Sequence, residues 1–226
     1  VEINLAGDLS RLRLGPESDS SLRLSGLLDG TIQLKQNPEN WDLNARLRAQ
    51  QVTKLQDAGE GQLLADEATA NLRAQIAKGF TQADVLEMSL VTPYGRVEGR
   101  GPITELSGSP RFDLAGTVSP DWTYLTQLIA REVEPNASIA GTPHGWKLSG
   151  TLPDKDGVSL LQTVNGEIGV NLDVVDVFGM RLGTTTIVAR ARDGKIEIDP
   201  IDATLNSGRL HLEPTVITDK QGTTWL

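Results

Sequence analysis

The fold class of this sequence is decided by two stretches, WDLNARLRA at residues 41–49 and ATANLRAQI at residues 68–76. Apolar and polar residues alternate one by one in both, as at Leu43-Asn44 and Leu72-Arg73. Successive side chains of a β-strand point to opposite faces of a sheet, so each stretch predicts a strand with one apolar and one polar face. The Ala, Leu and Gln content of the second stretch also suits a helix, but its strict alternation favours a strand.

Shorter alternating runs recur along the rest of the chain. Their apolar members are Ile3/Leu5, Leu12/Leu14, Leu22/Leu24, Ile32/Leu34, Phe112/Leu114, Ile187/Ala189/Ala191, Ile196/Ile198 and Leu210/Leu212. Many short alternating runs separated by glycine and proline are typical of antiparallel sheets.

Turn residues lie between several of these runs. Asp193-Gly194 predicts a tight hairpin between residues 187–192 and 195–199, and Asn206-Ser207-Gly208 predicts a second hairpin directly after it. Together they predict an antiparallel meander from about Thr184 to Glu213. Asp29-Gly30 carries the same signal, and we interpret it as a turn between two strands.

One amphipathic helix is predicted at about residues 120–133. Ser119 is a good N-cap, Pro120 suits the first helical position, and Asp121 complements the positive end of the helix dipole. Apolar residues follow at helical spacing up to Val133, and Pro135 ends the helix. Such a helix packs within a connection between strands, or it caps an open end of the sheet or plugs a groove.

The predicted fold class is therefore mainly β. Antiparallel meanders form an elongated curled sheet or groove, or an open sandwich, with one amphipathic helix. The expected organisation is a β meander module at 1–118, a helical connection at 119–136 and a second meander at 137–226, or one continuous sheet. Because the sequence begins at Val1 without an initiator Met and closes on Trp225-Leu226, we expect a piece of a longer protein.

Composition excludes several function classes. Acidic residues outnumber basic ones, 30 to 21, which gives a net charge of −9 and argues against a surface that neutralises nucleic-acid phosphates. Cysteine is absent, which excludes disulfides, thiolate metal sites and Cys nucleophiles. No apolar run approaches the roughly 20 residues that a membrane-spanning helix needs.

The sequence holds no motif for catalysis, a metal or a cofactor. His144 lies in a predicted turn, and His211 lies between two apolar residues of a predicted strand, so that it faces solvent. Neither has the spacing of a zinc site. We therefore expect a protein that is not an enzyme and that has no cofactor and no metal. The apolar strand faces are the remaining candidate: they form a core if the sheet closes or stacks, and a continuous apolar groove if it curls without closing.

Residues 165–214 resemble the C-terminal region of AsmA-like proteins. The match is an order of glycine-rich and alternating strands, an Asp-Gly turn, a strand ending in Asp-Pro and a Ser-Gly turn. It is carried by Gly166, Gly169, Gly179, Leu182, Asp193, Gly194, Asp199, Pro200, Ser207, Gly208 and Leu210. A second stretch, residues 92–119, is similar to the family's strands with the pattern P-x-x-D-L-x-G.

The resemblance implies a non-enzymatic segment of a periplasmic or cell-envelope protein, with a membrane anchor outside this sequence. It implies an apolar groove for phospholipid acyl chains, and a role in lipid transport or outer-membrane homeostasis. The residues expected to line the groove are Ile187, Ala189, Ala191, Ile196, Ile198, Leu210, Leu212, Phe112 and Leu114. The helix at 120–133 departs from the family pattern. The alternative is a structural or adhesive β module with a closed core that binds protein partners.

Overall fold

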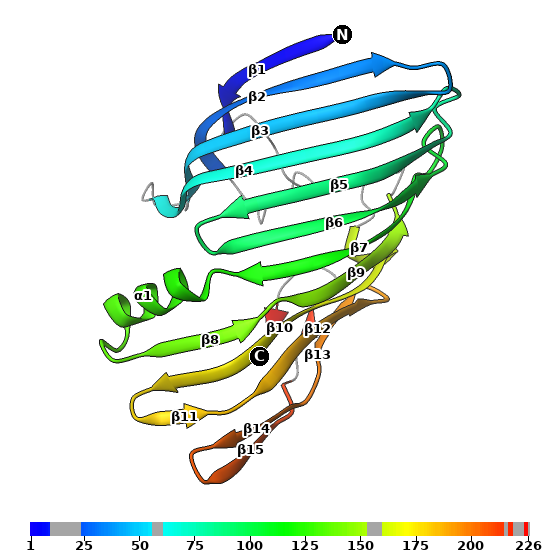
Figure 1. Cartoon of the computed structure of the whole chain (residues 1–226). Coiled ribbons are helices and arrows are strands. Elements are labelled where there is room, and N and C mark those ends of the chain that lie inside the picture. Colours follow the sequence, from blue (N-terminus) through cyan, green and yellow to red (C-terminus); the bar gives the residue numbers. More distant parts are fainter. Residues whose placement is uncertain (10–23, 56–60, 153–159, 215–216, 219–223, 226) are drawn as a thin grey trace. The chain divides into compact units, whose positions relative to one another are not determined.

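The protein is described from a computed structural model that covers residues 1–9, 24–55, 61–152, 160–214, 217–218 and 224–225. Strands dominate these residues, and β1 to β15 belong by their hydrogen bonds to one antiparallel sheet (Figure 1). In the described residues the order runs from β1 to β15, and these two end strands are not paired with each other. The prediction of a mainly β, open antiparallel fold with one amphipathic helix is confirmed.

The chain divides into two compact units. Unit 1 comprises residues 1–93, 98–112 and 152–158, and unit 2 comprises residues 94–97, 113–151 and 159–226. The division passes through β6 (Gly95–Thr104) and β7 (Arg111–Pro120).

Unit 1 is built on five consecutive antiparallel strands. They are β1 (Glu2–Asp8), β2 (Leu24–Gln36), β3 (Asn40–Leu55), β4 (Gly61–Ala77) and β5 (Gln82–Thr92). Each strand pairs with the next in sequence, as the blue to green arrows of Figure 1 show. Both stretches that decided the fold class are strands, in β3 and β4. The alternation therefore outweighed the helix-forming composition of residues 68–76.

The Asp29-Gly30 turn prediction is wrong, because both residues lie in the middle of β2. Gly30 pairs with Leu47 of β3 and with Leu5 of β1. A Cβ atom at position 30 would clash with the backbone oxygen of Arg46 and would lie 2.8 Å from Leu47 Cδ2. The glycine here makes room for the neighbouring strand and is not needed for a turn.

Unit 2 combines short strands with two helices, α1 (Trp122–Glu132) and the single-turn α2 (Leu160–Thr163). Its strands are β8 (Ser138–Thr142), β9 (His144–Thr151), β10 (Val164–Val177), β11 (Met180–Leu182), β12 (Thr185–Arg192), β13 (Lys195–Ile198), β14 (Ile201–Leu205), β15 (Gly208–Leu212), β16 (Ile217–Thr218) and β17 (Thr224–Trp225). The long strand β10 is central, because it pairs with β8, β9, β11 and β12.

Helix α1 starts two residues later than predicted. Strand β7 continues through Pro120, and Asp121 is the N-cap, with its Oδ1 accepting from the backbone N–H of Tyr124 at 2.8 Å. Trp122 packs over Gly141 of β8, where an added Cβ would lie 2.6 Å from the indole Cζ2 atom. The Thr126 hydroxyl bonds both backbone groups of Ile139 at 3.0 Å. The helix is thus docked on β8, and none of its residues is buried.

The predicted meander from Thr184 to Glu213 is two separate hairpins. Strand β12 pairs with β13, and β14 pairs with β15, but β13 and β14 are not neighbours. Strand β14 pairs instead with β11, through Leu205 and Leu182. The break falls at Asp199-Pro200, where proline has no backbone N–H to continue a ladder. Asp193-Gly194 forms the predicted tight turn, with φ of 52° and 76°.

Candidate functional site

The feature of unit 1 that stands out is a face on which apolar residues of all five strands align in rows. Paired residues of adjacent strands share a face, so the registers identify its members. We call this surface the unit 1 apolar face. It consists of Leu34, Leu43, Ala74 and Val85 in one row, Ile3, Ile32, Ala45, Leu72 and Met88 in the next, and Leu5, Gly30, Leu47, Ala70 and Leu90 in the third.

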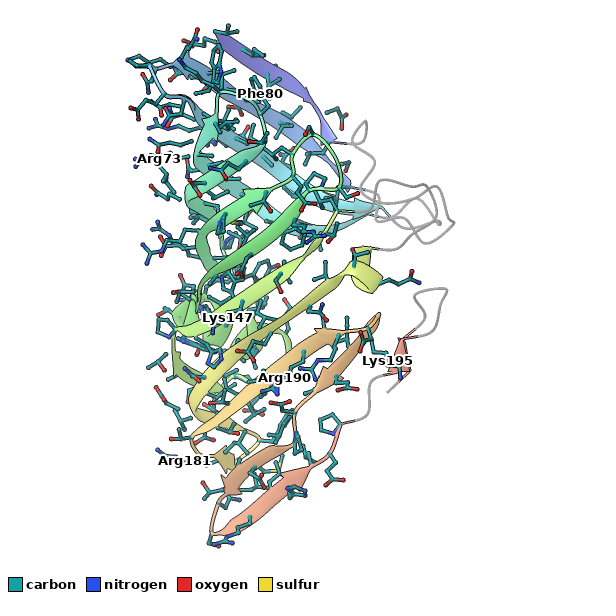
Figure 2. The ribbon with its side chains drawn as sticks, turned by 90° about the vertical axis from the view of Figure 1, so that its right-hand side faces the viewer. Arg73, Phe80, Lys147, Arg181, Arg190 and Lys195 are labelled. Atoms are coloured by element: carbon teal, nitrogen blue, oxygen red, sulfur yellow. The ribbon has the colours of Figure 1, made fainter. Side chains whose placement is uncertain are left out.

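The opposite face of the same strands is polar and bonded across the strands. Arg48 Nη2 lies 2.6 Å from Glu67 Oε2, and Arg73 Nη1 lies 3.2 Å from Glu87 Oε2. The hydrogen bond and charge of Glu67 raise the pKa of Arg48. Arg73, labelled in Figure 2, belongs to this face. The alternation read from the sequence therefore separates a wet face from an apolar one.

Part of the unit 1 apolar face is accessible in the part of the chain that the structure describes. Ile3 is 50% exposed and Leu90 is 44% exposed, although both lie in apolar rows. Ala74 and Val85 are buried, at one end of β4 and β5. No described side chain of the chain is less than 2% exposed, whereas a core between two stacked layers fully buries large side chains. Large side chains in the described part of the chain are therefore only partly shielded from solvent.

A β-bulge keeps the rows aligned at β5. Arg73 pairs with Glu87 and Ala74 pairs with Val85, so Leu86 is an extra residue without a partner in this register. Leu86 is 44% exposed. Without this insertion every residue of β5 beyond it would change face, because the side-chain period of a strand is two.

Five of the residues that the sequence analysis chose lie together in unit 2. Ala189 is directly opposite Ile198, and Ala191 is directly opposite Ile196, on β12 and β13. Ile187 belongs to the same face of β12, and the face continues on β10 through Ile168, which is 50% exposed.

The other four candidates lie on other strands. Leu210 and Leu212 share one face of β15, a strand that pairs with β14, and Leu212 is 46% exposed. Phe112 and Leu114 alternate with polar residues on β7 and are half-buried. Strand β7 is not hydrogen-bonded to β12, β13 or β15.

The unit 1 apolar face was not among the predicted groove residues, although the two stretches that decided the fold class lie there. The alternation of residues 41–49 and 68–76 indicated that each strand has an apolar face, but periodicity does not show which strands are neighbours.

Among ionisable groups, His211 stands out by its contacts. Its Nδ1 atom lies 2.7 Å from Asp202 Oδ1, and its Nε2 atom lies 3.3 Å from Glu213 Oε1. These two carboxylates, Asp202 first, raise the pKa of the imidazole. The side chain is exposed, as predicted. His144 is in strand β9 and not in the predicted turn, and its Nδ1 lies 3.0 Å from Asn171 Oδ1.

The described residues contain no group of three or more His, Cys, Asp or Glu side chains placed to hold a metal ion. None of their helices combines the length and the hydropathy that crossing a membrane requires. Comparison with protein families, with curated proteins and with solved structures yields no match to this chain.

Proposed function

We propose that the chain is a non-enzymatic segment whose unit 1 apolar face binds phospholipid acyl chains. The observation that carries the proposal is the alignment of three apolar rows, two of them across five strands and one across four, with Ile3 and Leu90 about half exposed. When an apolar ligand covers an accessible patch of aliphatic side chains, the removal of that surface from water favours binding by about 25 cal/mol per Å².

The chemistry of the face favours acyl chains over polar metabolites. Its rows contain only Leu, Ile, Val, Ala, Met and Gly, so they offer no side-chain hydrogen-bond donor or acceptor. A site for a small polar molecule requires a few placed polar groups to fix the ligand's orientation. An alkyl chain needs none, and it can lie along a row of aliphatic side chains.

The wider role is an extension of this proposal. The similarity of residues 165–214 and 92–119 to AsmA-like sequences supports lipid transport or outer-membrane homeostasis, in a periplasmic or envelope protein. In that role the face is a passive apolar surface along which acyl chains lie.

Native mass spectrometry of the purified chain, followed by organic extraction, tests the proposal. We expect reproducible phospholipid adducts that organic solvent releases. The variant Ala70→Asp, which places a carboxylate in the middle of the third row, should lose them. Thr69→Asp is the matched control, because Thr69 is the adjacent residue on the polar face, opposite Arg48. A bare mass after incubation with phospholipid vesicles would instead favour the structural or adhesive β module.

A further inference from the structure

A hollow in unit 2 lies among charged side chains that the acyl-chain proposal does not use. Its volume is about 290 Å³, and it is lined by parts of β7, β9, β10 and β12. Its polar lining includes Lys147, Arg190 and Arg192, with Asp113, Asn165 and Glu167. Because one water occupies about 30 Å³ of liquid, the hollow has room for a small anion with part of its hydration shell.

The strand registers place these side chains on one face of the sheet. Lys147 of β9 is opposite Glu167 of β10, which is opposite Arg190 of β12. Residues two positions apart on a strand share a face, so Asn165 and Arg192 belong to the same side. Lys147 and Arg190 are labelled in Figure 2, together with Lys195 of β13.

Two of the three cations form no ion pair with the carboxylates of the described residues. Arg190 is occupied, because its Nη2 lies 2.8 Å from Asp199 Oδ2 and its Nε lies 3.7 Å from Glu167 Oε2. Neither Lys147 nor Arg192 forms an ion pair within 4 Å with any described residue, although Asp113 also lines the hollow. Two exposed cations therefore flank a space of the size of a hydrated anion.

A second observation concerns the charges beside Arg192. Arg192 is directly opposite Lys195 across the β12–β13 hairpin. Like charges in opposite positions of a strand pair are destabilising. In a chain with a net charge of −9 such a pair is unexpected. An anion bound beside Arg192 would remove the repulsion. Asp193 in the turn and Glu197 two residues beyond Lys195 are the nearest acidic residues along the hairpin.

We propose that this hollow binds a phosphate group, with Lys147 and Arg192 as its charged ligands and Asn165 as a neutral donor. The three donors come from three neighbouring strands and line the hollow from the same face of the sheet. That arrangement suits a tetrahedral anion with several acceptor oxygens, and the guanidinium fork of Arg matches phosphate geometry. The source of the phosphate is a free small anion or the headgroup of an anionic lipid.

Amide chemical shifts of the chain during a titration with inorganic phosphate test this directly, with chloride at equal ionic strength as the reference. We expect saturable shifts confined to β9, β10 and β12 at millimolar phosphate. Lys147→Gln and Arg192→Gln should each weaken binding about tenfold, the effect of one charge-assisted hydrogen bond. Asp113→Asn should tighten binding several-fold, because it removes a negative charge from the lining; a purely structural role predicts no such gain.

Arg181→Gln is the matched control, since Arg181 is an exposed cation of unit 2 outside the hollow. A second arm measures flotation with vesicles of phosphatidylglycerol against vesicles of phosphatidylcholine. Binding to phosphatidylglycerol that needs Lys147, without binding of inorganic phosphate, identifies the headgroup as the source. The proposal is overturned if neither probe binds, or if Arg181→Gln weakens binding as much as Lys147→Gln does.

Discussion

The pair Gly30→Ala and Gly7→Ala tests how tightly the unit 1 apolar face is built. Gly30 belongs to this face, opposite Leu47, and Gly7 lies on the same side of β1 two residues beyond Leu5, opposite Leu28. An added Cβ at Gly30 would clash with the Arg46 carbonyl oxygen and lie 2.8 Å from Leu47 Cδ2 and 3.0 Å from Leu47 Cα. At Gly7 it would have nothing within 4 Å. The same added methyl group is therefore crowded on β2 and in open space on the neighbouring strand β1.

The expected free-energy changes have opposite signs. Two of the atoms that crowd position 30 belong to the backbone and cannot move aside, so we expect the overpacking cost of about 1–3 kcal/mol. A small gain, about 0.4–1 kcal/mol, comes from the stiffer unfolded chain. Gly30→Ala should therefore lower the free energy of unfolding by about 1–2 kcal/mol. Gly7→Ala should raise it by about 0.4–1 kcal/mol, because only the unfolded-state effect applies.

Hydrogen exchange of the β2, β3 and β4 amides, read by mass spectrometry in increasing urea, measures unit 1 by itself. We expect these amides to exchange through unfolding at lower urea in Gly30→Ala and at equal or higher urea in Gly7→Ala. Equal shifts in the two variants would refute the reasoning, because the close approach of Leu47 and Arg46 would then have no energetic consequence.

Three other predictions concern single residues. The His211 pKa should be above its ordinary value of about 6.5 in an NMR titration, and Asp202→Asn should lower it. Because folding raises the His211 pKa, the contribution of this contact to folding stability is complete below about pH 6.5 and is lost as pH rises through the folded-state pKa. A His211 titration that is unchanged in Asp202→Asn would contradict this prediction. Phe178→Asn should raise the free energy of unfolding by about 1 kcal/mol, since Phe178 has φ of 53° and is 61% exposed, and asparagine suits this turn; a lower urea midpoint would contradict the prediction. Thr126→Val should lower the free energy of unfolding by about 1–2 kcal/mol, because the variant loses both hydrogen bonds to Ile139. Thr126→Ser keeps a hydroxyl and should change the free energy of unfolding less.

Strand faces could be predicted from the sequence because alternation is a local property. Leu72 and Ala45 were each assigned to an apolar face from their own stretches, and the structure pairs them on one face. The Asp193-Gly194 turn was also predictable, since its left-handed backbone favours those residue types.

Other features depend on neighbours that the sequence does not identify. Asp29-Gly30 has the same two residue types as the turn at 193–194, yet it lies inside β2, where Gly30 pairs with Leu5 of β1 and with Leu47 of β3. Likewise, Ser119-Pro120 has the form of a helix start, but these residues complete β7 and Asp121 caps the helix instead.

The sequence predicted that the candidate site is an aliphatic strand face, but it did not predict which strands form that face. Periodicity identified aliphatic strand faces, and the resemblance directed attention to residues 187–212. The alignment of three rows in unit 1 depends on register and on the bulge at Leu86, neither of which follows from the sequence of one strand. The phosphate hollow was not foreseen, because Lys147 and Arg192 are 45 positions apart and meet only through their pairing with β10.

The most direct test of the account is the affinity of the chain for a phospholipid with an environment-sensitive fluorophore on one acyl chain, compared among the parent sequence, Ala70→Asp and Thr69→Asp. If acyl chains cover the unit 1 apolar face, the carboxylate at position 70 loses its water. Binding should then weaken at least about 100-fold, or about 2.7 kcal/mol, while Thr69→Asp binds like the parent. Equal affinity of the two variants, or no binding by the parent chain, would contradict the proposal that this face is a lipid-binding surface.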